Sequence, residues 1–202
     1  EFKRASVNME DVIIKDTIGM EHPFNYRNKT TFSVSKKDNE IIIGPYEEKT
    51  YNTVDIDRCL LQSPEADNII SAFKKLMKKY NIEPYDKKTG KGNIRNIVIR
   101  SNKENQFMLI FVTTREDFPN KEKLVDDIKK IEEIKTLVQN INMRKTNLSM
   151  GHKNITLYGQ GTIDDYVGGL KFSISPETFF QVNPIQTEII YETAISYADL
   201  NK

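Results

Sequence analysis

Two side-chain amides lie among aromatic residues near the C-terminal end of the chain. Residues 172–183 read FSISPETFFQVN, so that Gln181 and Asn183 follow a pair of phenylalanines. A half-buried glutamine needs partners for both its donor and its acceptor atoms, and a bound ligand can supply them. The alternative is a strand-to-helix junction at which the amides only cap the helix that follows, as side-chain amides commonly do. Both interpretations stay open from the residues alone.

Basic side chains beside aromatic ones form a second candidate site, one for RNA. Arg27 and Lys29 alternate along a predicted strand, which puts both cations on one face. Three lysines of the loop 86–92 precede Arg95, and Arg100 follows at the end of the same predicted strand. Cations next to aromatic rings on a sheet suit phosphate contacts combined with base stacking. A solvated, lysine-rich surface without a ligand is the alternative.

The one cysteine of the sequence, Cys59, lies between a predicted strand and a predicted helix. Such a residue is usually a buried structural thiol. Alternatively, it is one ligand of a metal or cluster whose other ligands lie outside this chain, because an iron–sulfur cluster usually needs four thiolates. His22 and His152 have no Cys, Asp or Glu at ligand spacing, so the sequence predicts no metal site made from this chain alone.

The overall composition excludes several classes of protein. The 202 residues carry 30 basic and 29 acidic side chains, a net charge of +1, so any RNA contact must come from local patches. No apolar run approaches the roughly 18 residues that a membrane span needs. A single cysteine excludes an internal disulfide framework and suits a reducing, cytoplasmic compartment. The glycines between 159 and 169 lack the flanking strand and helix of a phosphate-binding loop, and we interpret them as turns.

The elements that must position these residues follow from hydrophobic periodicity. Ser63, Pro64 and Glu65 form a helix start with a hydroxyl cap, and apolar residues recur after it at helical spacing. Asn120 is expected to cap a second helix, and a third follows Pro184. Strands are predicted at residues 26–34, 40–43, 51–56, 94–100, 107–112, 136–143, 155–158 and 170–175. The pattern indicates an α+β fold, an antiparallel sheet with helices packed on one face.

Both ends of the chain are expected to belong to a larger protein. Residues 1–20 are predicted to be helical up to about Asn8. Four apolar residues after that point are expected to be buried: Val12, Ile13, Ile14 and Ile18. The final helix stops where a short loop to a following strand would be natural. We therefore interpret the sequence as an excised piece of a longer protein.

Four segments, in this order, resemble the RNA uracil-5-methyltransferase family, which makes 5-methyluridine in tRNA and in 23S ribosomal RNA. The segments are HPFNYRNK at 22–29, DIDRC at 55–59, RNIVIR at 95–100 and FSISPETFFQVN at 172–183. The last segment is the most specific, and together the four span nearly the whole chain. The DIDRC segment makes the resemblance closer to the ribosomal-RNA branch than to the tRNA branch.

The resemblance implies a three-part enzyme. It has an N-terminal oligonucleotide-binding barrel, a central RNA-recognition domain and a C-terminal Rossmann-like domain that binds S-adenosylmethionine. Residues 21–176 are expected to be the central α/β domain. Residues 1–20 are expected to pack on the methyltransferase domain, and residues 177–202 to be the first elements of that domain.

The resemblance also implies roles for single residues. Gln181 matches the family glutamine at the pocket for the cofactor and the target base, and Phe179 and Phe180 are placed to stack beside that base. Cys59 matches the distant fourth ligand of a [4Fe–4S] cluster, whose other three cysteines this sequence lacks. The remaining RNA contacts are expected from four basic residues: Arg27, Lys29, Arg95 and Arg100.

The chemistry of the family explains why these parts are needed. Carbon 5 of uracil is a poor nucleophile, so a cysteine thiolate adds at carbon 6 and the resulting enolate attacks the methyl sulfonium. A base then removes the carbon 5 proton, and the cysteine is expelled. We expect that cysteine, the base and the cofactor loop beyond Lys202, so this chain alone is predicted to be inactive. The expected partner is a single-stranded or loop region of 23S ribosomal RNA, bound by a monomer without membrane contact.

Other functions stay open. The chain could be a non-catalytic RNA-binding module, or the enzyme could act on tRNA rather than ribosomal RNA. A third alternative is a scaffold domain without RNA contact. In that case Arg27 and Arg100 would be paired to buried acids.

Overall fold

A computed structural model of the chain describes residues 12–144 and 148–198. The strands are β1 (Lys29–Lys37), β2 (Glu40–Gly44), β3 (Ile94–Ser101), β4 (Phe107–Thr113), β5 (Ile134–Ile141), β6 (Lys153–Tyr158), β7 (Ile163–Val167) and β8 (Leu170–Ile174). The helices are α1 (Pro64–Lys79), α2 (Lys121–Ile128) and α3 (Pro184–Ala198). The helix expected up to about Asn8 lies outside the described residues. Among the helices that are described, none has the length and apolar character needed to cross a membrane.

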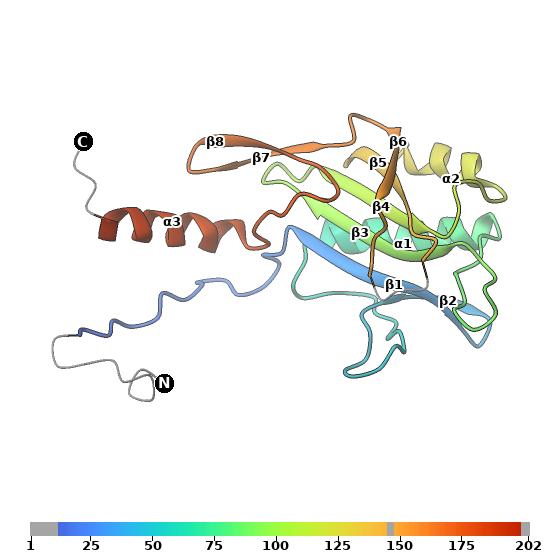
Figure 1. Cartoon of the computed structure of the whole chain (residues 1–202), viewed down its shortest axis with the longest axis horizontal. Helices are drawn as coiled ribbons and strands as arrows, with labels where there is room; N and C mark the ends of the chain where they lie inside the picture. Colours follow the sequence, from blue (N-terminus) through green and yellow to red (C-terminus); the bar gives the residue numbers. More distant parts are fainter. Residues whose placement is uncertain (1–11, 145–147, 199–202) are drawn as a thin grey trace.

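Six strands form one mixed sheet, in the order β2-β1-β3-β4-β5-β6 (Figure 1). Neighbouring strands are antiparallel except β4 and β5, which are parallel. The expectation of a purely antiparallel sheet is therefore wrong at this pair. The physical reason is the connection that contains α2, because parallel neighbours need a long crossover, usually through a helix. Strands β7 and β8 pair separately as a two-stranded hairpin.

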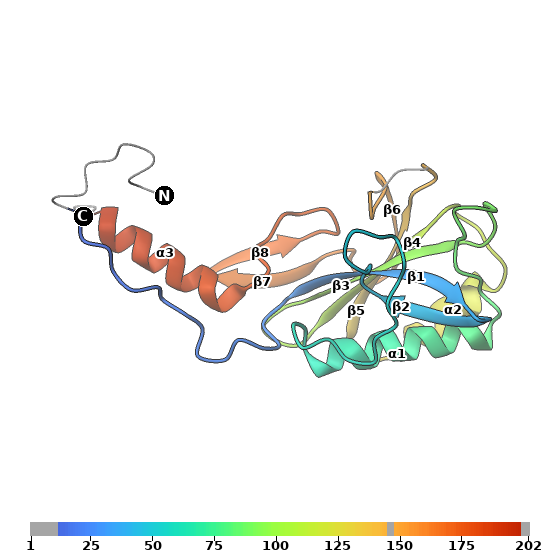
Figure 2. The ribbon, with the colours of Figure 1, turned by 90° about the horizontal axis from the view of Figure 1, so that it is seen from below.

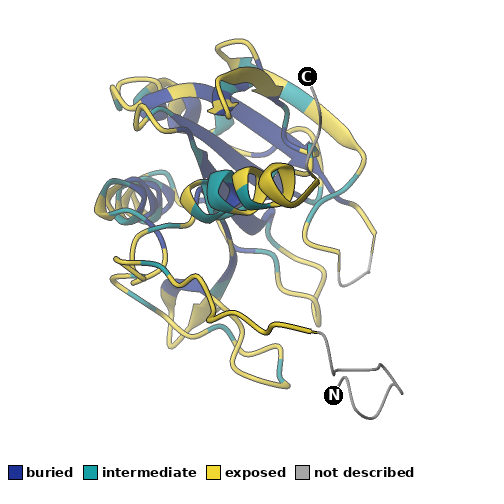
Figure 3. Ribbon diagram, turned by 90° about the vertical axis from the view of Figure 1, so that its left-hand side faces the viewer, coloured by how far each residue is buried: buried dark blue, intermediate teal, exposed yellow. Residues whose placement is uncertain are grey.

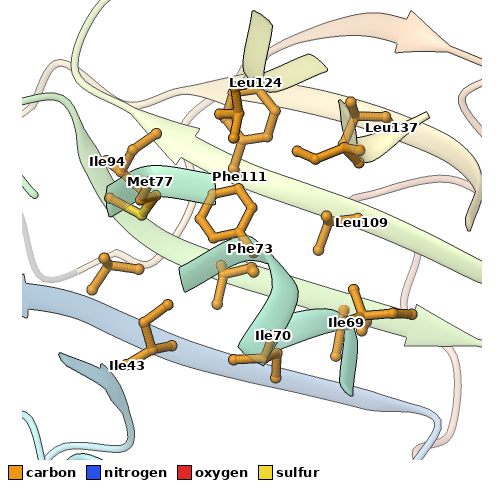
Figure 4. Packing of buried hydrophobic residues seen from close by; sticks show 14 of the residues in the cluster. Ile43, Ile69, Ile70, Phe73, Met77, Ile94, Leu109, Phe111, Leu124 and Leu137 are labelled. Atoms are coloured by element: carbon orange, nitrogen blue, oxygen red, sulfur yellow. The ribbon is translucent and has the colours of Figure 1, made fainter. Parts of the chain in front are cut away.

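Helices α1 and α2 cover one face of the sheet, as the sequence predicted (Figure 2). The Ser63 hydroxyl caps α1 by accepting a hydrogen bond from the Ala66 N–H at 3.3 Å, and Pro64 takes the first turn. Phe73 of α1 lies against Phe111 of β4, with ring centroids 6.1 Å apart (Figure 4). Both rings are fully buried. The removal of both rings from water contributes much of the free energy that holds α1 on the sheet.

The β7–β8 hairpin covers part of the second face of the sheet. It contributes Ile163 and Ile174 to a smaller buried cluster with the sheet residues Val98, Met108, Ile110, Val112 and Val138. The sequence analysis missed β7. The reason is that an acid, Asp165, occupies a buried position of this short strand, which breaks the expected alternation of polar and apolar residues.

Two further expectations about the elements are wrong. Residues 51–56 run beside the end of β2, where an isolated bridge joins Tyr46 to Thr53, but they do not form a strand. Asn120 has a left-handed backbone, with φ 62°, and makes no side-chain cap. Its amide donates to the Tyr80 carbonyl at 2.9 Å instead. That bond joins the start of α2 to the end of α1.

We expect Phe73→Ala to lower the free energy of unfolding by about 3–5 kcal/mol, because it leaves a cavity between α1 and the sheet. Urea unfolding followed by circular dichroism measures this loss. Phe179→Ala is the matched control, since its ring is 83% exposed; its effect should stay within about 0.5 kcal/mol. Equal losses for the two variants would contradict the assignment of Phe73 to the core.

Candidate functional site

The start of β1 lies between two segments that are distant in the sequence. The Arg27 N–H donates to the Leu61 carbonyl at 2.7 Å, and the Asn28 N–H donates to the Val182 carbonyl at 3.1 Å. The side-chain Nδ2 of Asn28 also donates to the Gln181 carbonyl at 3.0 Å. The start of β1 therefore joins the segment before α1 to the segment before α3.

Arg100, near the end of β3, holds the same C-terminal segment. Its Nη2 donates to the Pro176 carbonyl at 3.2 Å and to the Thr178 carbonyl at 2.5 Å. The residue is 3% exposed. Burial lowers the pKa of the Arg100 guanidinium to about 10, which leaves it charged at neutral pH. Because a charged donor makes stronger hydrogen bonds than a neutral one, Arg100 is a firm anchor for this turn.

Lys29 lies directly opposite Arg100 in the ladder between β1 and β3. The pKa of the Lys29 amine is lowered, first by burial and second by the charge of Arg100. Two neighbouring cations disfavour each other's charged form, and an anion between them relieves that repulsion. Arg100 is buried and held by main-chain carbonyls, so of these two cations the half-buried Lys29 is the one that an anion can reach.

The turn before α3 gives the two phenylalanines different surroundings. Phe180 is half-buried and lies against Phe172 of β8, with ring centroids 5.9 Å apart. Phe179 points outward and is exposed. Gln181 is exposed as well, and within the described part of the chain its side-chain amide has no hydrogen-bond partner. One ring and one amide thus remain accessible to a ligand.

Asn183 caps α3. Its Oδ1 accepts a hydrogen bond from the Gln186 N–H at 3.1 Å, and its carbonyl accepts one from the Thr187 N–H at 3.0 Å. The capping interpretation is therefore confirmed for Asn183. Gln181 is the amide that stays available for the ligand interpretation.

Helix α3 extends away from the sheet with most of its surface exposed (Figures 1 and 3). Glu188 ties it to the rest of the chain by accepting from Lys103 Nζ at 2.7 Å and from the Gly168 N–H at 3.3 Å. Several large apolar or aromatic side chains of the helix are exposed: Ile185, Ile190, Tyr191, Ile195 and Tyr197. A helix with so much exposed apolar surface is typical of an element that packs against another part of a protein.

The stretch before β1 contacts α3 and the residue that caps it. Lys15 Nζ lies over the Tyr197 ring, 5.1 Å from its centroid, and Asn183 Nδ2 lies 2.9 Å from Met20 Sδ. The four apolar residues of this stretch are exposed: Val12, Ile13, Ile14 and Ile18. The expected burial of these four is wrong in this structure, because the described residues leave their side chains uncovered.

Cys59 is positioned by a polar network beneath the start of β1. Its N–H donates to both carboxylate oxygens of Asp67, each at 3.2 Å. The same carboxylate accepts from Gln62 Nε2 at 2.5 Å, and the Thr30 hydroxyl donates to Gln62 Oε1. Gln62 is buried with both of its polar atoms bonded, as buried amides generally are. The network fixes the backbone at Cys59 and leaves its side chain half-buried.

The fit of this site to a metal cluster is partial. A [4Fe–4S] cluster usually needs four thiolates, and Cys59 is the one cysteine of the sequence. Within residues 12–144 and 148–198, no three His, Cys, Asp or Glu side chains gather into a site that could hold a metal ion. Cys59 can therefore supply one ligand at most, and its role as a ligand stays a prediction.

Arg95 lies apart from the other basic residues. It stands near the start of β3, five residues before Arg100, which corresponds to about 17 Å of extended strand. Its Nη1 donates to the carbonyls of Asn142 and Arg144 at 2.8 and 2.6 Å, and its guanidinium carbon lies 5.3 Å from the centroid of the Tyr85 ring. Arg95 therefore anchors the chain after β5, at the other end of the sheet from Gln181.

The two buried arginines thus bind main-chain carbonyls. Arg100 shows no pairing to a buried acid in the described residues, so the condition expected of a scaffold domain is not met there. Arg27 is exposed, and it makes no ion pair with any residue that the structure describes. Direct RNA contacts of Arg27, Lys29, Arg95 and Arg100 stay predictions.

Sequence reasoning missed three residues that build the site: Asn28, Gln62 and Asp67. Asn28 lies between Arg27 and Lys29, on the opposite face of the predicted strand, and its residue type alone indicated no partner. Gln62 carried one usable signal, because it is an amide directly before the helix start at Ser63. Its partners could not be recognised, since they come from β1 and from the first turn of α1.

No protein-family model matches the chain. The chain is similar to an uncharacterized RNA methyltransferase of Clostridium acetobutylicum, at 44% identity over 198 residues, which covers 97% of this chain and 43% of that protein. An uncharacterized RNA methyltransferase of Caldanaerobacter subterraneus is 45% identical over 185 residues, covering 91% of this chain and 41% of that protein. The chain thus spans less than half the length of these relatives.

The fold is similar to that of a solved enzyme. The crystal structure of Pyrococcus abyssi tRNA (uracil-54, C5)-methyltransferase in complex with S-adenosyl-L-homocysteine matches with a TM-score of 0.70, over 87% of this chain and 41% of that one. At 22% identity, this likeness shows a shared fold. The likeness of fold extends over most of this chain and over less than half of the solved enzyme.

We expect Arg100→Met to loosen the turn before α3, because two carbonyls lose a charged donor while the length of the side chain is kept. The free energy of unfolding should fall by about 1–3 kcal/mol. Amide hydrogen exchange should accelerate in residues 177–182 more than in the sheet. Arg27→Met is the matched control and should change neither quantity, since Arg27 is exposed. Unchanged exchange in Arg100→Met would refute the anchoring role.

Proposed function

We propose that the chain is the RNA-recognition part of an S-adenosylmethionine-dependent RNA (uracil-C5)-methyltransferase that forms 5-methyluridine in 23S ribosomal RNA. The observation that carries the proposal is the turn before α3. There Asn28 and Arg100 hold the main chain of residues 176–182, while Gln181 and Phe179 stay exposed. A fixed backbone with an accessible amide and an accessible ring suits recognition of a single base.

The comparisons support the reaction class. The similar bacterial proteins are named as RNA methyltransferases, and the solved enzyme of the same fold is named as a C5-methyltransferase of a tRNA uracil. We assign 23S ribosomal RNA as the substrate, rather than tRNA, because of the segment that ends at Cys59, which resembles the ribosomal-RNA branch.

The chemistry of uracil suits the exposed residues. An amide has both donor and acceptor atoms, so Gln181 can bond the carbonyl oxygen and the N–H on the edge of a uracil. The exposed ring of Phe179 can stack on that base after it has left its own stack. We assign the neighbouring phosphates to Lys29, which lies beside Arg100, and to the exposed Arg27. Half-buried Phe180 then supports the wall of the pocket from behind.

The exposed apolar surface supports the proposed domain boundaries. We assign residues 21–176 to the RNA-recognition domain, and residues 1–20 and 177–202 to the methyltransferase domain that binds S-adenosylmethionine. The described part of the first terminal segment contacts α3 and its cap, and both carry uncovered apolar side chains. Large exposed apolar patches mark contact surfaces. Gln181 lies directly before this surface, at the boundary between the two domains.

Cys59 is proposed as one thiolate ligand of a [4Fe–4S] cluster, with three further cysteines supplied from outside this chain. The support is the polar network that fixes its backbone and the partial exposure of the residue. A bound cluster would supply a rigid link between the segment before α1 and the part of the protein that carries the other ligands. The network through Gln62 and Asp67 would orient the Cys59 backbone for that bond.

The full product of the gene that encodes this chain should transfer methyl groups from labelled S-adenosylmethionine to 23S ribosomal RNA. Mass spectrometry of the digested RNA should identify 5-methyluridine. Gln181→Leu should lower kcat/KM by roughly 100-fold or more, because the polar edge of uracil would then enter the pocket without partners.

Asn68→Leu serves as the matched control for this substitution, because Asn68 is an exposed amide on α1 and lies outside the proposed pocket. It should retain full activity. Formation of 5-methyluridine in tRNA alone would overturn the assignment of the substrate. Absence of 5-methyluridine from both RNAs would overturn the proposed reaction.

A further inference from the structure

The first part of the connection between β2 and α1 carries two exposed tyrosines, Tyr46 and Tyr51. This part folds back on itself. The Glu47 N–H donates to the Asn52 carbonyl at 2.8 Å, and the Val54 N–H donates to the Pro45 carbonyl at 2.9 Å. Gly44 allows the close return of the chain, because a Cβ atom there would lie 1.9 Å from the Val54 carbonyl oxygen. The turn is thus held in a defined shape.

The two tyrosine rings form a pair at the surface. The ring centroids of Tyr46 and Tyr51 are 5.8 Å apart, and the ring planes meet at 85°. Tyr46 is 42% exposed and Tyr51 is 63% exposed. Edge-to-face pairs of this kind are favourable in themselves, so the rings hold each other in place while a large part of their surface stays in water.

Lysine side chains from a second loop complete this surface. Lys87 Nζ lies 4.7 Å from the ring centroid of Tyr51 and 5.9 Å from that of Tyr46. The loop is closed by Asp86, which accepts a hydrogen bond from the Lys88 N–H at 2.7 Å, and by Gly92. A Cβ atom at Gly92 would lie 1.9 Å from the Pro84 carbonyl oxygen. Both glycines therefore fix where the rings and the lysines meet.

The lysine loop carries three cations and one acid, Asp86, which interacts with Lys88. Lys87, Lys88 and Lys91 are exposed, and none of them makes an ion pair with a residue in the described ranges. The nearby acids are engaged locally: Glu47 bonds the side chains of Thr50 and Asn52, and Glu48 pairs with Lys49 at 3.4 Å. A polyanion with flat bases fits such a surface better than an apolar or an acidic protein segment does.

We infer that Tyr46, Tyr51 and the lysines of the 86–92 loop form a second RNA-binding surface, on which an unpaired nucleotide stacks while Lys87 contacts its phosphate. This inference rests on the proposed function, since it adds a contact to the same RNA substrate. The two RNA contacts are separate. The lysine loop adjoins the start of β3 through the Tyr85 N–H, which donates to the Ile94 carbonyl at 2.7 Å. Arg100 lies near the other end of this strand, about 20 Å away.

The surface would position the RNA strand beside the target loop without reading its sequence, because every base has a ring face that can stack. The surface would add affinity for RNA and fix the position of the RNA strand, while the pocket at Gln181 would select the base. Loss of the surface should therefore weaken RNA binding for any single-stranded sequence, whereas loss of Gln181 should impair the methyl transfer.

The test is binding of a fluorescent single-stranded RNA oligonucleotide to the full chain at several salt concentrations. Tyr51→Leu should weaken binding about 5-fold or more, because a base loses its stacking partner. Tyr51→Phe should bind like the unmodified chain, since the ring is kept. Lys87→Met should make the slope of log K against log salt shallower by about 0.7, the value for one phosphate contact on a single strand.

Two matched controls separate this surface from a general effect on the chain. Tyr158 is 40% exposed on β6, the edge strand opposite β2, and Lys75 is an exposed lysine of α1. Tyr158→Leu and Lys75→Met should leave binding and the salt slope unchanged. Polyphosphate, which has no bases, should lose affinity with Lys87→Met but not with Tyr51→Leu.

Two results for Tyr51→Leu would overturn the stacking surface. One is unchanged RNA binding, and the other is a loss of polyphosphate affinity as large as the loss of RNA affinity. Neither result would contradict the proposed methyltransferase function. A loss of RNA affinity in Tyr158→Leu as large as that in Tyr51→Leu would also overturn the stacking surface. No RNA binding by the unmodified chain overturns both RNA surfaces. If Tyr51→Leu weakens RNA binding but the reaction products contain no 5-methyluridine, only the proposed reaction is overturned.

Discussion

The buried guanidinium of Arg100 is the interaction on which the rest of the site depends. It brings a positive charge into the interior, where its Nη2 donates to two carbonyls of the turn before α3. Placing a charge there has a desolvation cost, which the lowered pKa of the group reflects. The turn must keep its shape for that cost to be offset. The exposed amide of Gln181 thus follows a turn that the charge of Arg100 holds through the carbonyls of Pro176 and Thr178.

Strand β3 carries two arginines that have a structural role. Arg95 and Arg100 stand near its two ends, and each holds a later segment of the chain by its carbonyls. Between them the strand lies in the core of the sheet. Exposed cations that we assign to RNA contacts belong to other elements, such as Arg27 before β1 and Lys87 in the loop before β3. The buried arginines thus hold the main chain in place, whereas the exposed cations are available to a polyanion.

Local features of this structure were predictable from the sequence, and the long-range ones were not. The Ser63 cap and the apolar stripe through Phe73 follow from residue type and helical spacing. The parallel pairing of β4 and β5 had one local signal, the predicted helix between the two strands, but the apolar runs of the strands themselves do not tell the direction of pairing. The burial of Arg100 was missed because arginine is mostly exposed. Its partners lie 76 and 78 positions further along the chain, beyond the reach of any local pattern.

The hydrogen bond from Asn28 to the Gln181 carbonyl joins residues that are 153 positions apart. A contact of such sequence separation forms late, because the entropy of closing the long loop must be overcome first. During synthesis from the N-terminus, the ribosome releases β1 and β3 well before the turn that they hold. Until that turn emerges, Arg100 has no carbonyls to bind. The turn that carries Gln181 can therefore reach its anchored shape only after β1 and β3 have already been synthesised.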